Sequence, residues 1–525
     1  MTPSQRVFVN TMSQYGRTMI NMVLSLYTVR IVLGALGESD YGIYILIAGI
    51  VSMLSFVTNS LVTTTQRFVS YYQGKGELQS IKDVFNNSLI IHIAISLCIA
   101  ISLIIVMPIL FNGGLNIPSC RIEASMTVYK VIIIIVSLAF LTSPFRALLI
   151  SHENIIYLSV VDIFDGILKL ALAVIMTIMP YDKLILYAYI MLFIQAFNAV
   201  AIAGYCYLKY KECVFPQINR INKKYIKELM GFAGWSVYST GCVLGRQQGV
   251  AILLNKAMGT IVNSAYGIAF QIASYTNFLS SSLINSMAPQ IVKAEGTGER
   301  EKALWLSSTA CKFMFFLISA ICIPCMFEID AILQWWLKKV PANASLFCVM
   351  VMSASMVDAL TVGLGHINQA IGKIRDYSLI VNTPKFLTVL FIGIALHYGC
   401  DLFFIAIVFV VVELLSSILR IFVVKKTAGL EIQYFIKEIF VREIVPILLC
   451  ILFCVLFTKF VHFNYRFSVT IILSIVLLAL GVYKWGLSEK EEDILRKLFF
   501  AFRANIKRRF KRDERIDKKK NAEIV

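Results

Sequence analysis

Several ionisable residues lie inside long apolar runs of this sequence, where each would cost at least about 2.5 to 3.5 kcal/mol at the centre of a membrane-spanning helix. Because of that cost, such side chains are candidates for binding a ligand or an ion. The cations outnumber the acids, which favours an anionic ligand. The cations are Arg17, Arg30, Arg146, Lys169, Arg246, Lys312 and Lys385, and the acids are Asp162, Asp165, Asp358 and Glu413.

Arg17 and Arg246 are placed so that they could share one anion. Each lies deep in the first long apolar run of one half of the chain, and Arg246 is followed by Gln247. A guanidinium can hold a diphosphate through charge-assisted, bidentate hydrogen bonds, so we expect the pair to bind such a group between the two halves. The alternative is a structural ion pair with an acid. Arg30 and Arg146 lie near the ends of their runs and are expected to reach the lipid headgroups, although Arg30 remains a candidate substrate ligand.

The acids indicate coupling to an ion. Asp162, Asp165 and Lys169 share one helical face, at spacings of three and four residues. A carboxylate in a low dielectric could titrate and couple transport to H⁺ or Na⁺, and the candidates are Asp162, Asp165 and Glu413. The alternative is an ion pair between Asp165 and Lys169. No group of His and Cys has metal-ligand spacing, so we expect no metal and no catalytic residue.

The composition identifies the elements that carry these residues as membrane helices. Of the 525 residues, 58% are apolar and 15% are charged, whereas soluble domains average roughly 45–50% and about 25%. Because a span needs about 20 apolar residues, the runs predict an all-α integral membrane protein with fourteen transmembrane helices. They lie at 9–34, 42–65, 87–111, 125–150, 156–179, 183–208, 228–255, 261–288, 303–327, 344–368, 378–397, 402–424, 444–459 and 467–486.

The charge of the loops orients these helices. Lys and Arg gather in alternate loops and in the tail, so the positive-inside rule places both termini in the cytoplasm. The predicted parts are an N-lobe of six helices, a cytoplasmic linker, a C-lobe of six helices, two further helices and a basic cytoplasmic tail. They cover 1–208, 209–227, 228–425, 442–487 and 488–525. Apolar spacing in the tail predicts an amphipathic helix on the inner leaflet.

The two six-helix blocks look like copies of one unit. Segments 35–37, 41–43 and 74–77 correspond to 257–259, 266–268 and 296–299, at offsets of 222, 225 and 222. Because six is even, both copies cross in the same sense and form two lobes around a V-shaped central cavity. The second helix of each block is rich in Ser, Thr and Asn, including Asn59 and Asn277. This predicts a hydrated lining suited to sugars, and the alternative is helix packing by small hydroxyl residues.

Four short motifs carry a resemblance to a known family. They are Arg30-Ile-Val-Leu-Gly-Ala-Leu-Gly37, Asp40-Tyr41-Gly42-Ile43-Tyr44, Gln66-Arg67-Phe68 with Gly74-x-Gly76, and Ala370-Ile371-Gly372-Lys373. The chain resembles the multidrug/oligosaccharidyl-lipid/polysaccharide (MOP) exporter superfamily, and within it the polysaccharide-type flippases of bacterial envelope synthesis. The resemblance implies export, by alternating access, of an oligosaccharide attached through diphosphate to a polyprenol.

We therefore expect a flippase of the bacterial inner membrane and not an enzyme. Its substrate would be an undecaprenyl-diphosphate-linked oligosaccharide for O-antigen, capsule or exopolysaccharide. The expected partners are membrane lipids and the glycosyltransferases and polymerase of the same pathway, with no nucleic acid. One alternative is a cation-coupled multidrug exporter of the same superfamily, but the first helices of both lobes carry arginine and no acid apart from Glu228. The other is a polysaccharide ligase or polymerase, for which the outer loops are short.

Overall fold

The computed structural model describes residues 3–52, 54–111, 118–336, 340–461, 463, 465–493 and 496. Helices form nearly all of this part of the chain, and it contains no strand. Among these residues, eight helical segments are long and apolar enough to cross a membrane, and the bent pair α10 (Ala344–Ala359) and α11 (Leu364–Ile371) brings the number to nine. The predicted all-α membrane fold is confirmed.

The other helices follow the predicted spans in order. The longer ones are α1 (Pro3–Ser52), α2 (Ser55–Lys75), α3 (Leu78–Ile109), α4 (Ile122–Ser151), α5 (Ile155–Ile178), α6 (Lys183–Lys209), α7 (Lys223–Gly296), α8 (Arg300–Phe327), α13 (Thr383–His397), α14 (Leu402–Ala428), α16 (Val441–Phe460) and α17 (Arg466–Gly481). The short ones are α9 (Ile329–Trp336), α12 (Ile374–Tyr377) and α15 (Ile432–Phe435). Single π-helical turns follow α12, α15 and α17. The predicted spans lie on these helices, but two of them cross a break: 42–65 runs from α1 into α2, and 344–368 runs from α10 into α11. The five predicted spans that are not among the apolar segments above lie on α1, α2, α5 and α7.

Two helices, α1 and α7, each hold more than one predicted span. In α1 the break is at Gly37, whose backbone (φ 77°, ψ 170°) suits a residue without a Cβ. In α7 the hydroxyl of Tyr266 donates to the carbonyl of Gln247 at 3.4 Å. These residues are 19 positions apart, which is about 28 Å along a straight helix. The chain of α7 therefore folds back between them.

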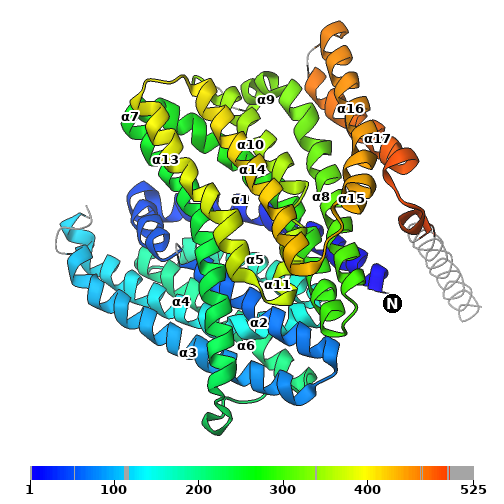
Figure 1. Cartoon of the computed structure of the whole chain (residues 1–525). Helices are drawn as coiled ribbons and strands as arrows, with labels where there is room; N and C mark the ends of the chain where they lie inside the picture. The colour runs from blue at the N-terminus through cyan, green and yellow to red at the C-terminus, as the bar shows by residue number, and fades with distance from the viewer. Residues whose placement is uncertain are drawn as a thin grey trace, which may run out of the picture.

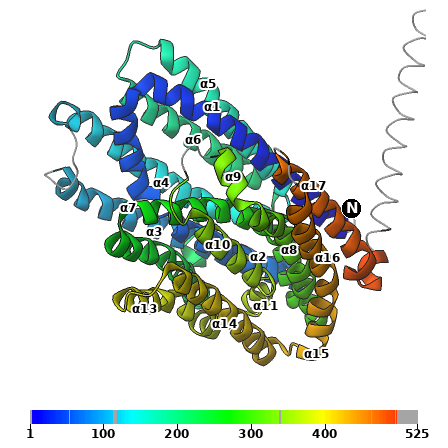
Figure 2. The same ribbon diagram turned by 90° about the horizontal axis from the view of Figure 1, so that it is seen from above.

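The helices form two groups that follow the chain order. Figure 1 shows α2, α3, α4 and α6 in the lower part of the molecule and α10, α13 and α14 in the upper part. Helix α7 packs along α2 of the first group and along α8, α10 and α13 of the second. Figures 1 and 2 both place α16 and α17 at one edge, where they pack against α8.

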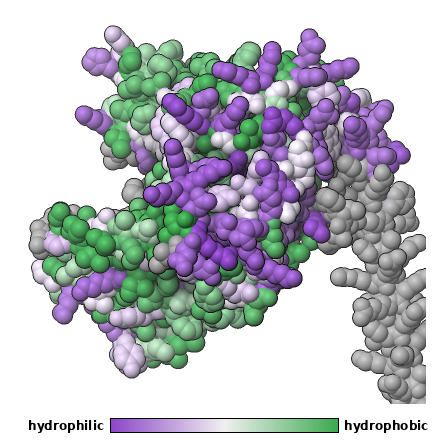
Figure 3. Space-filling model, turned by 60° about the horizontal axis from the view of Figure 1, so that its bottom comes forward, coloured by the Kyte–Doolittle hydropathy of each residue, from purple (hydrophilic) through white to green (hydrophobic). Residues whose placement is uncertain are grey.

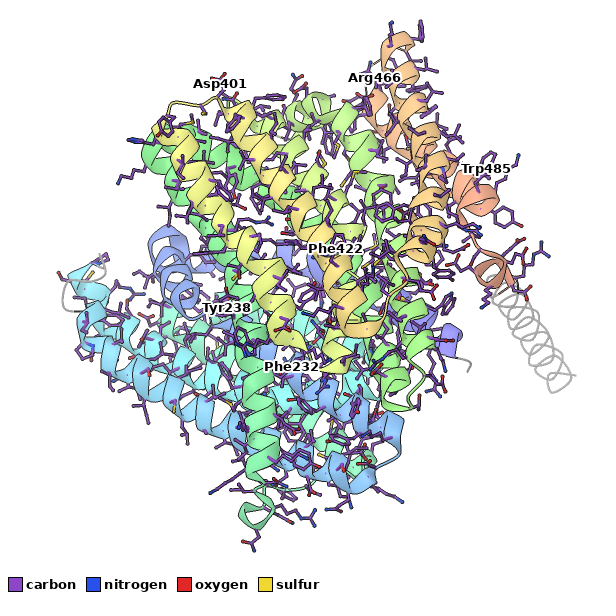
Figure 4. The ribbon with its side chains drawn as sticks, in the orientation of Figure 1. Phe232, Tyr238, Asp401, Phe422, Arg466 and Trp485 are labelled. Atoms are coloured by element: carbon purple, nitrogen blue, oxygen red, sulfur yellow. The ribbon has the colours of Figure 1, made fainter. Side chains whose placement is uncertain are left out.

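Ion pairs fix this edge to the second group at both ends. At the upper end, Arg466 of α17 places Nε and Nη2 each 2.8 Å from an oxygen of Glu328 (Figure 4). At the other end, Nζ of Lys312 in α8 lies 2.5 Å from Oε2 of Glu491, and both side chains are almost fully buried. Lys312, one of the cations within the apolar runs, thus anchors the segment that follows α17.

Two glycines mark a pseudo-twofold contact between the halves. A Cβ on Gly74 would clash with the carbonyl of Lys293, and a Cβ on Gly296 would clash with the carbonyl of Tyr71. Both glycines and both carbonyl residues are related by the same offset of 222 positions. The following glycines of the two segments, at 76 and 298, both have positive φ, 73° and 80°. Equivalent residues of the two blocks therefore meet across an axis, which agrees with the predicted duplication.

Further contacts close the same end of the molecule. Nε and Nη2 of Arg67 donate to the carbonyls of Gln369 and Ala370 at 2.9 and 3.0 Å. Nζ of Lys293 lies 2.9 Å from Oε1 of Glu153. We call these contacts, together with the glycine contact, the lobe junction. It lies at the ends of α2 and α7, beside loops that are rich in Lys and Arg.

The topology makes a labelling prediction. In intact cells, a membrane-impermeant maleimide should label Ala342→Cys but not Lys224→Cys, because the Lys/Arg bias places these exposed positions on opposite sides of the membrane. The unsubstituted protein supplies the background from its native cysteines. Permeabilised cells should label both variants equally, and labelling of Lys224→Cys before permeabilisation would reverse the orientation. Asn112 and Lys518 would serve the same purpose but lie outside the described residues.

Candidate functional site

The first charged network joins three helices of the first group. Nη1 of Arg17 in α1 lies 2.6 Å from Oδ2 of Asp162 in α5, and Nη2 of Arg146 in α4 lies 3.0 Å from Oδ1 of the same carboxylate. Asn21 donates to the backbone carbonyl of Asp162 at 3.1 Å. The predicted alternative for Arg17, an ion pair with an acid, is the arrangement observed. Arg146 joins this network, so the expectation that it reaches the headgroups is wrong.

The second acid of α5 has its own partners. Oδ2 of Asp165 lies 2.6 Å from Nζ of Lys169, and Oδ1 accepts a 2.6 Å hydrogen bond from Asn198 of α6. The ion pair at a spacing of four residues, predicted as the alternative to an ion-coupling role, is present. Asp165 is therefore neutralised within its own helix, whereas Asp162 is shared by two arginines.

The second network is larger and more deeply buried. Glu413 of α14 pairs with Arg246 of α7, with 2.6 Å between Oε2 and Nη1, and with Lys385 of α13. Asp358 of α10 pairs with Lys385 at 2.9 Å and with Arg420 at 2.8 Å. The side chain of Glu413 is 2% exposed and that of Lys385 6%. Arg420 lies two helical turns after Glu413 in α14, but its acidic partner is Asp358.

Both networks hold one more cation than acid. The first has two arginines around one carboxylate, and the second has three cations around two carboxylates. Arg17 and Arg246 occupy comparable places, on the first helix of each block and facing an acid from a later helix. In each network a second cation contacts the acid that holds the arginine. Either arginine can therefore turn to another anion without leaving that acid unpaired.

A cavity of about 230 Å³ adjoins the second network. Arg246, Gln247, Lys385, Asp358 and Glu413 line it, together with small and apolar side chains. The Arg246 guanidinium carbon lies 4.4 Å from the ring centroid of Phe409, which holds the flat group in place. This space offers a guanidinium, an ammonium and an amide to a small anionic or polar group. No group of acids, His and Cys in the described part of the chain could hold a metal ion.

Asn59 is the one remaining predicted ligand whose side chain the structure describes, and no contact with either network is found for it. Asn59 is exposed on α2, while the side chains of Arg30 and Asn277 are not among those that the structure describes. The hydroxyls of Thr64 and Thr65 donate to carbonyls four residues earlier in α2, at 2.8 and 3.0 Å. These two hydroxyls are therefore satisfied within their own helix.

Sequence reasoning missed three members of the site. Asp358 and Lys385 were recognised among the charges in the apolar runs but were given no specific role, and Arg420 was not recognised as a member of the site. The ion pairs that unite them join residues 27 and 62 positions apart, so no helical period connects them. Arg67 of the lobe junction was also missed, although it stands in the Gln66-Arg67-Phe68 motif.

This chain is similar to known proteins in part of its sequence and in its fold. The family model described as "Polysaccharide biosynthesis protein" matches residues 4–244. A comparison with curated proteins gave no match. Among solved structures, a MATE transporter in the straight conformation is 15% identical, with a TM-score of 0.71, and the match covers 82% of this chain and 97% of that one. The chain has the fold of the MOP-superfamily transporters. The resemblance indicated by the motifs is therefore confirmed at the level of the fold.

Two other transporters of this fold are similar to the same extent. An outward-facing MATE family transporter of the MOP superfamily has a TM-score of 0.69 at 14% identity, with 82% of this chain and 96% of that chain covered. A MOP superfamily transporter from Pyrococcus furiosus, described by the reverse polarity of its binding pocket, has a TM-score of 0.68 at 14% identity and the same coverage. At these identities the likeness shows the MOP fold and leaves the substrate to the chemistry of the site.

Proposed function

We propose that this protein is a flippase that moves polyprenyl-diphosphate-linked oligosaccharides across the bacterial cytoplasmic membrane by alternating access. The observation that carries the proposal is the excess positive charge of both buried networks. A diphosphate can accept bidentate hydrogen bonds from Arg17 and Arg246, while Arg146 and Lys385 keep Asp162 and Glu413 neutralised. The match to polysaccharide biosynthesis proteins supports this substrate class.

The carboxylates give a route for coupling to H⁺ or Na⁺. A proton on Asp162 or a sodium ion beside it would compete with Arg17, and the freed guanidinium would then bind the diphosphate. Glu413 would act on Arg246 in the same way. Asp165 is the weaker candidate for ion coupling, because its carboxylate already pairs with Lys169 and accepts a hydrogen bond from Asn198.

Opening and closing of the lobe junction would change the conformation during transport. With both termini in the cytoplasm, the junction closes the cytoplasmic side and leaves the halves free to part on the other side, which corresponds to an outward-facing state. Alternating access requires Arg67 and Lys293 to release their partners and the opposite ends to close. We further propose that glycosyltransferases deliver the loaded carrier at the cytoplasmic face and that a polymerase takes it over on the outer face.

The experiment that tests this function uses vesicles containing the purified chain and a fluorescent undecaprenyl-diphosphate oligosaccharide. Arg17→Ala and Arg246→Ala should each slow translocation by at least about tenfold, which is the loss of one charge-assisted hydrogen bond. Abundance should stay near normal, because the neighbouring cation still pairs with the acid. Lys at either position should restore activity only in part.

Transport of a cationic dye distinguishes the proposed flippase from a multidrug exporter. A multidrug exporter would expel the dye from the same vesicles and leave the glycolipid in place, and that result would contradict the proposed substrate. Full glycolipid translocation in the Arg246→Ala protein would remove this residue from the site.

A further inference from the structure

A pocket of about 880 Å³ opens beside the lobe junction and outside both charged networks. Its walls come from α2, the start of α7, the connection from α11 to α12, and the end of α14. Figure 4 shows one lining residue, Phe232, low on α7. Figure 3 turns this end of the molecule forward and shows hydrophilic side chains gathered over its middle. The pocket thus lies at the end of the molecule that is predicted to face the cytoplasm.

The rim of this pocket is strongly basic. Six of its lining residues are cations and two, Glu228 and Asp376, are acids. The cations are Arg67, Lys224, Lys227, Lys373, Arg375 and Lys426. Within the described part of the chain, none of the six forms an ion pair with an acid, whereas every cation of the two charged networks contacts a carboxylate. An excess of positive charge converging on one space is the arrangement that attracts an anion.

Arg67 has a fixed position in the wall of this pocket. It is only 9% exposed, and its donors hold the carbonyls of Gln369 and Ala370. Its guanidinium carbon lies 4.4 Å from the ring centroid of Phe68. Gly372, with φ 89°, lets the backbone approach so closely that a Cβ there would meet the Arg67 side chain. Both the guanidinium and the adjoining turn are therefore fixed in position.

Aromatic side chains also line the pocket. Phe68, Phe232 and Trp235 form part of its wall together with the basic residues, and Arg375 lies 5.8 Å from the Trp235 ring centroid. Tryptophan beside basic residues is typical of the membrane interface, where one side of a site is polar and the other apolar. A lipid, which has a charged headgroup and an apolar stem, fits this mixed lining.

We propose that this pocket binds the anionic, phosphate-bearing headgroup of a lipid from the cytoplasmic leaflet. Two sources share that chemistry, a bulk anionic phospholipid and the diphosphate of a polyprenyl carrier. The site is distinct from the central networks, so a lipid could occupy it in the state in which the lobe junction is closed. Binding here does not require that the protein translocate anything.

The test measures lipid binding to the purified full-length chain by native mass spectrometry. Phosphatidylglycerol, undecaprenyl diphosphate and zwitterionic phosphatidylcholine are titrated separately. The pocket variant carries Lys224→Gln, Lys373→Gln and Lys426→Gln. The control carries Lys211→Gln, Lys425→Gln and Lys437→Gln, which are exposed lysines that do not line the pocket. Both variants lose the same net charge.

The pocket variant should bind at least one of the two anionic lipids at least about tenfold more weakly, because each lysine near an anionic group adds about fivefold. The control should change by less than about twofold. A pocket-dependent loss for phosphatidylglycerol identifies bulk lipid as a ligand, and a loss for undecaprenyl diphosphate alone identifies the carrier. Equal loss in the control, or no preference over phosphatidylcholine, would overturn the proposal. Because binding is read without transport, the result is independent of the proposed flippase activity.

Discussion

Glu413→Gln should lower the free energy of unfolding by about 3–5 kcal/mol, the usual cost of removing one partner from a buried ion pair. The Glu413 carboxylate contacts both Arg246 and Lys385, and its side chain is 2% exposed. The glutamine keeps the shape but removes the carboxylate that Arg246 and Lys385 share, so that Lys385 keeps Asp358 as a partner and Arg246 loses its ion pair. Thermal unfolding of the purified protein, in detergent at fixed lipid content, measures the loss.

Two further variants test whether charge causes this loss. Glu413→Gln combined with Lys385→Met removes one of the stranded cations and should recover at least half of the lost stability. Glu492→Gln breaks the exposed pair with Arg496, whose side chains are 37% and 63% exposed, and should change stability by less than about 1 kcal/mol. If Glu413→Gln unfolds at the temperature of the unsubstituted protein, the network is not a structural element of the fold.

Gly74→Ala should force the lobe junction open. Its Cβ would clash with the carbonyl of Lys293, and Gly296→Ala would clash in the same way with Tyr71. Added atoms at a tight contact cost about 1–3 kcal/mol, so the closed state should lose roughly five- to 150-fold in population. Spin labels at the exposed positions Gln79 and Glu301 should report a longer distance, and translocation should fall with it.

A glycine from the same kind of helix supplies the control. A Cβ on Gly204 of α6 meets nothing within 4 Å, so Gly204→Ala should leave the distance unchanged and could add the usual helix stabilisation of about 0.5–1 kcal/mol. The label distances are compared in a background without exposed cysteines. An unchanged distance in both Gly74→Ala and Gly296→Ala would mean that the junction does not govern the conformation.

The sequence predicted the helices well because the membrane imposes a local rule. A span must bury about 20 apolar residues and satisfy its own backbone hydrogen bonds, so the predicted spans could be found without knowledge of their neighbours. The glycines at 37, 74 and 296 stood out in the sequence, since a positive φ at Gly37 and a close backbone contact at Gly74 and Gly296 each favour a residue without a Cβ.

For the buried site, the sequence predicted the types of residue but not most of the pairs that they form. The excess of cations in the apolar runs indicated an anionic ligand, and both networks keep that excess. The one partnership inferred correctly was Asp165 with Lys169, which are four residues apart in a single helix. Local spacing could not reveal the pairs of Arg17 and Arg246, because their acids lie 145 and 167 positions away.

The sequence by itself therefore determined the membrane class, the order of the helices, the internal repeat and the sign of the buried charge, since each depends on short-range hydrophobicity or on glycine geometry. The tertiary structure alone decided which acid neutralises which arginine, which end of the molecule is closed, and where the unpaired lysines gather. These depend on how distant helices cross, and ion pairing acts over a few ångströms in space whatever the separation along the chain.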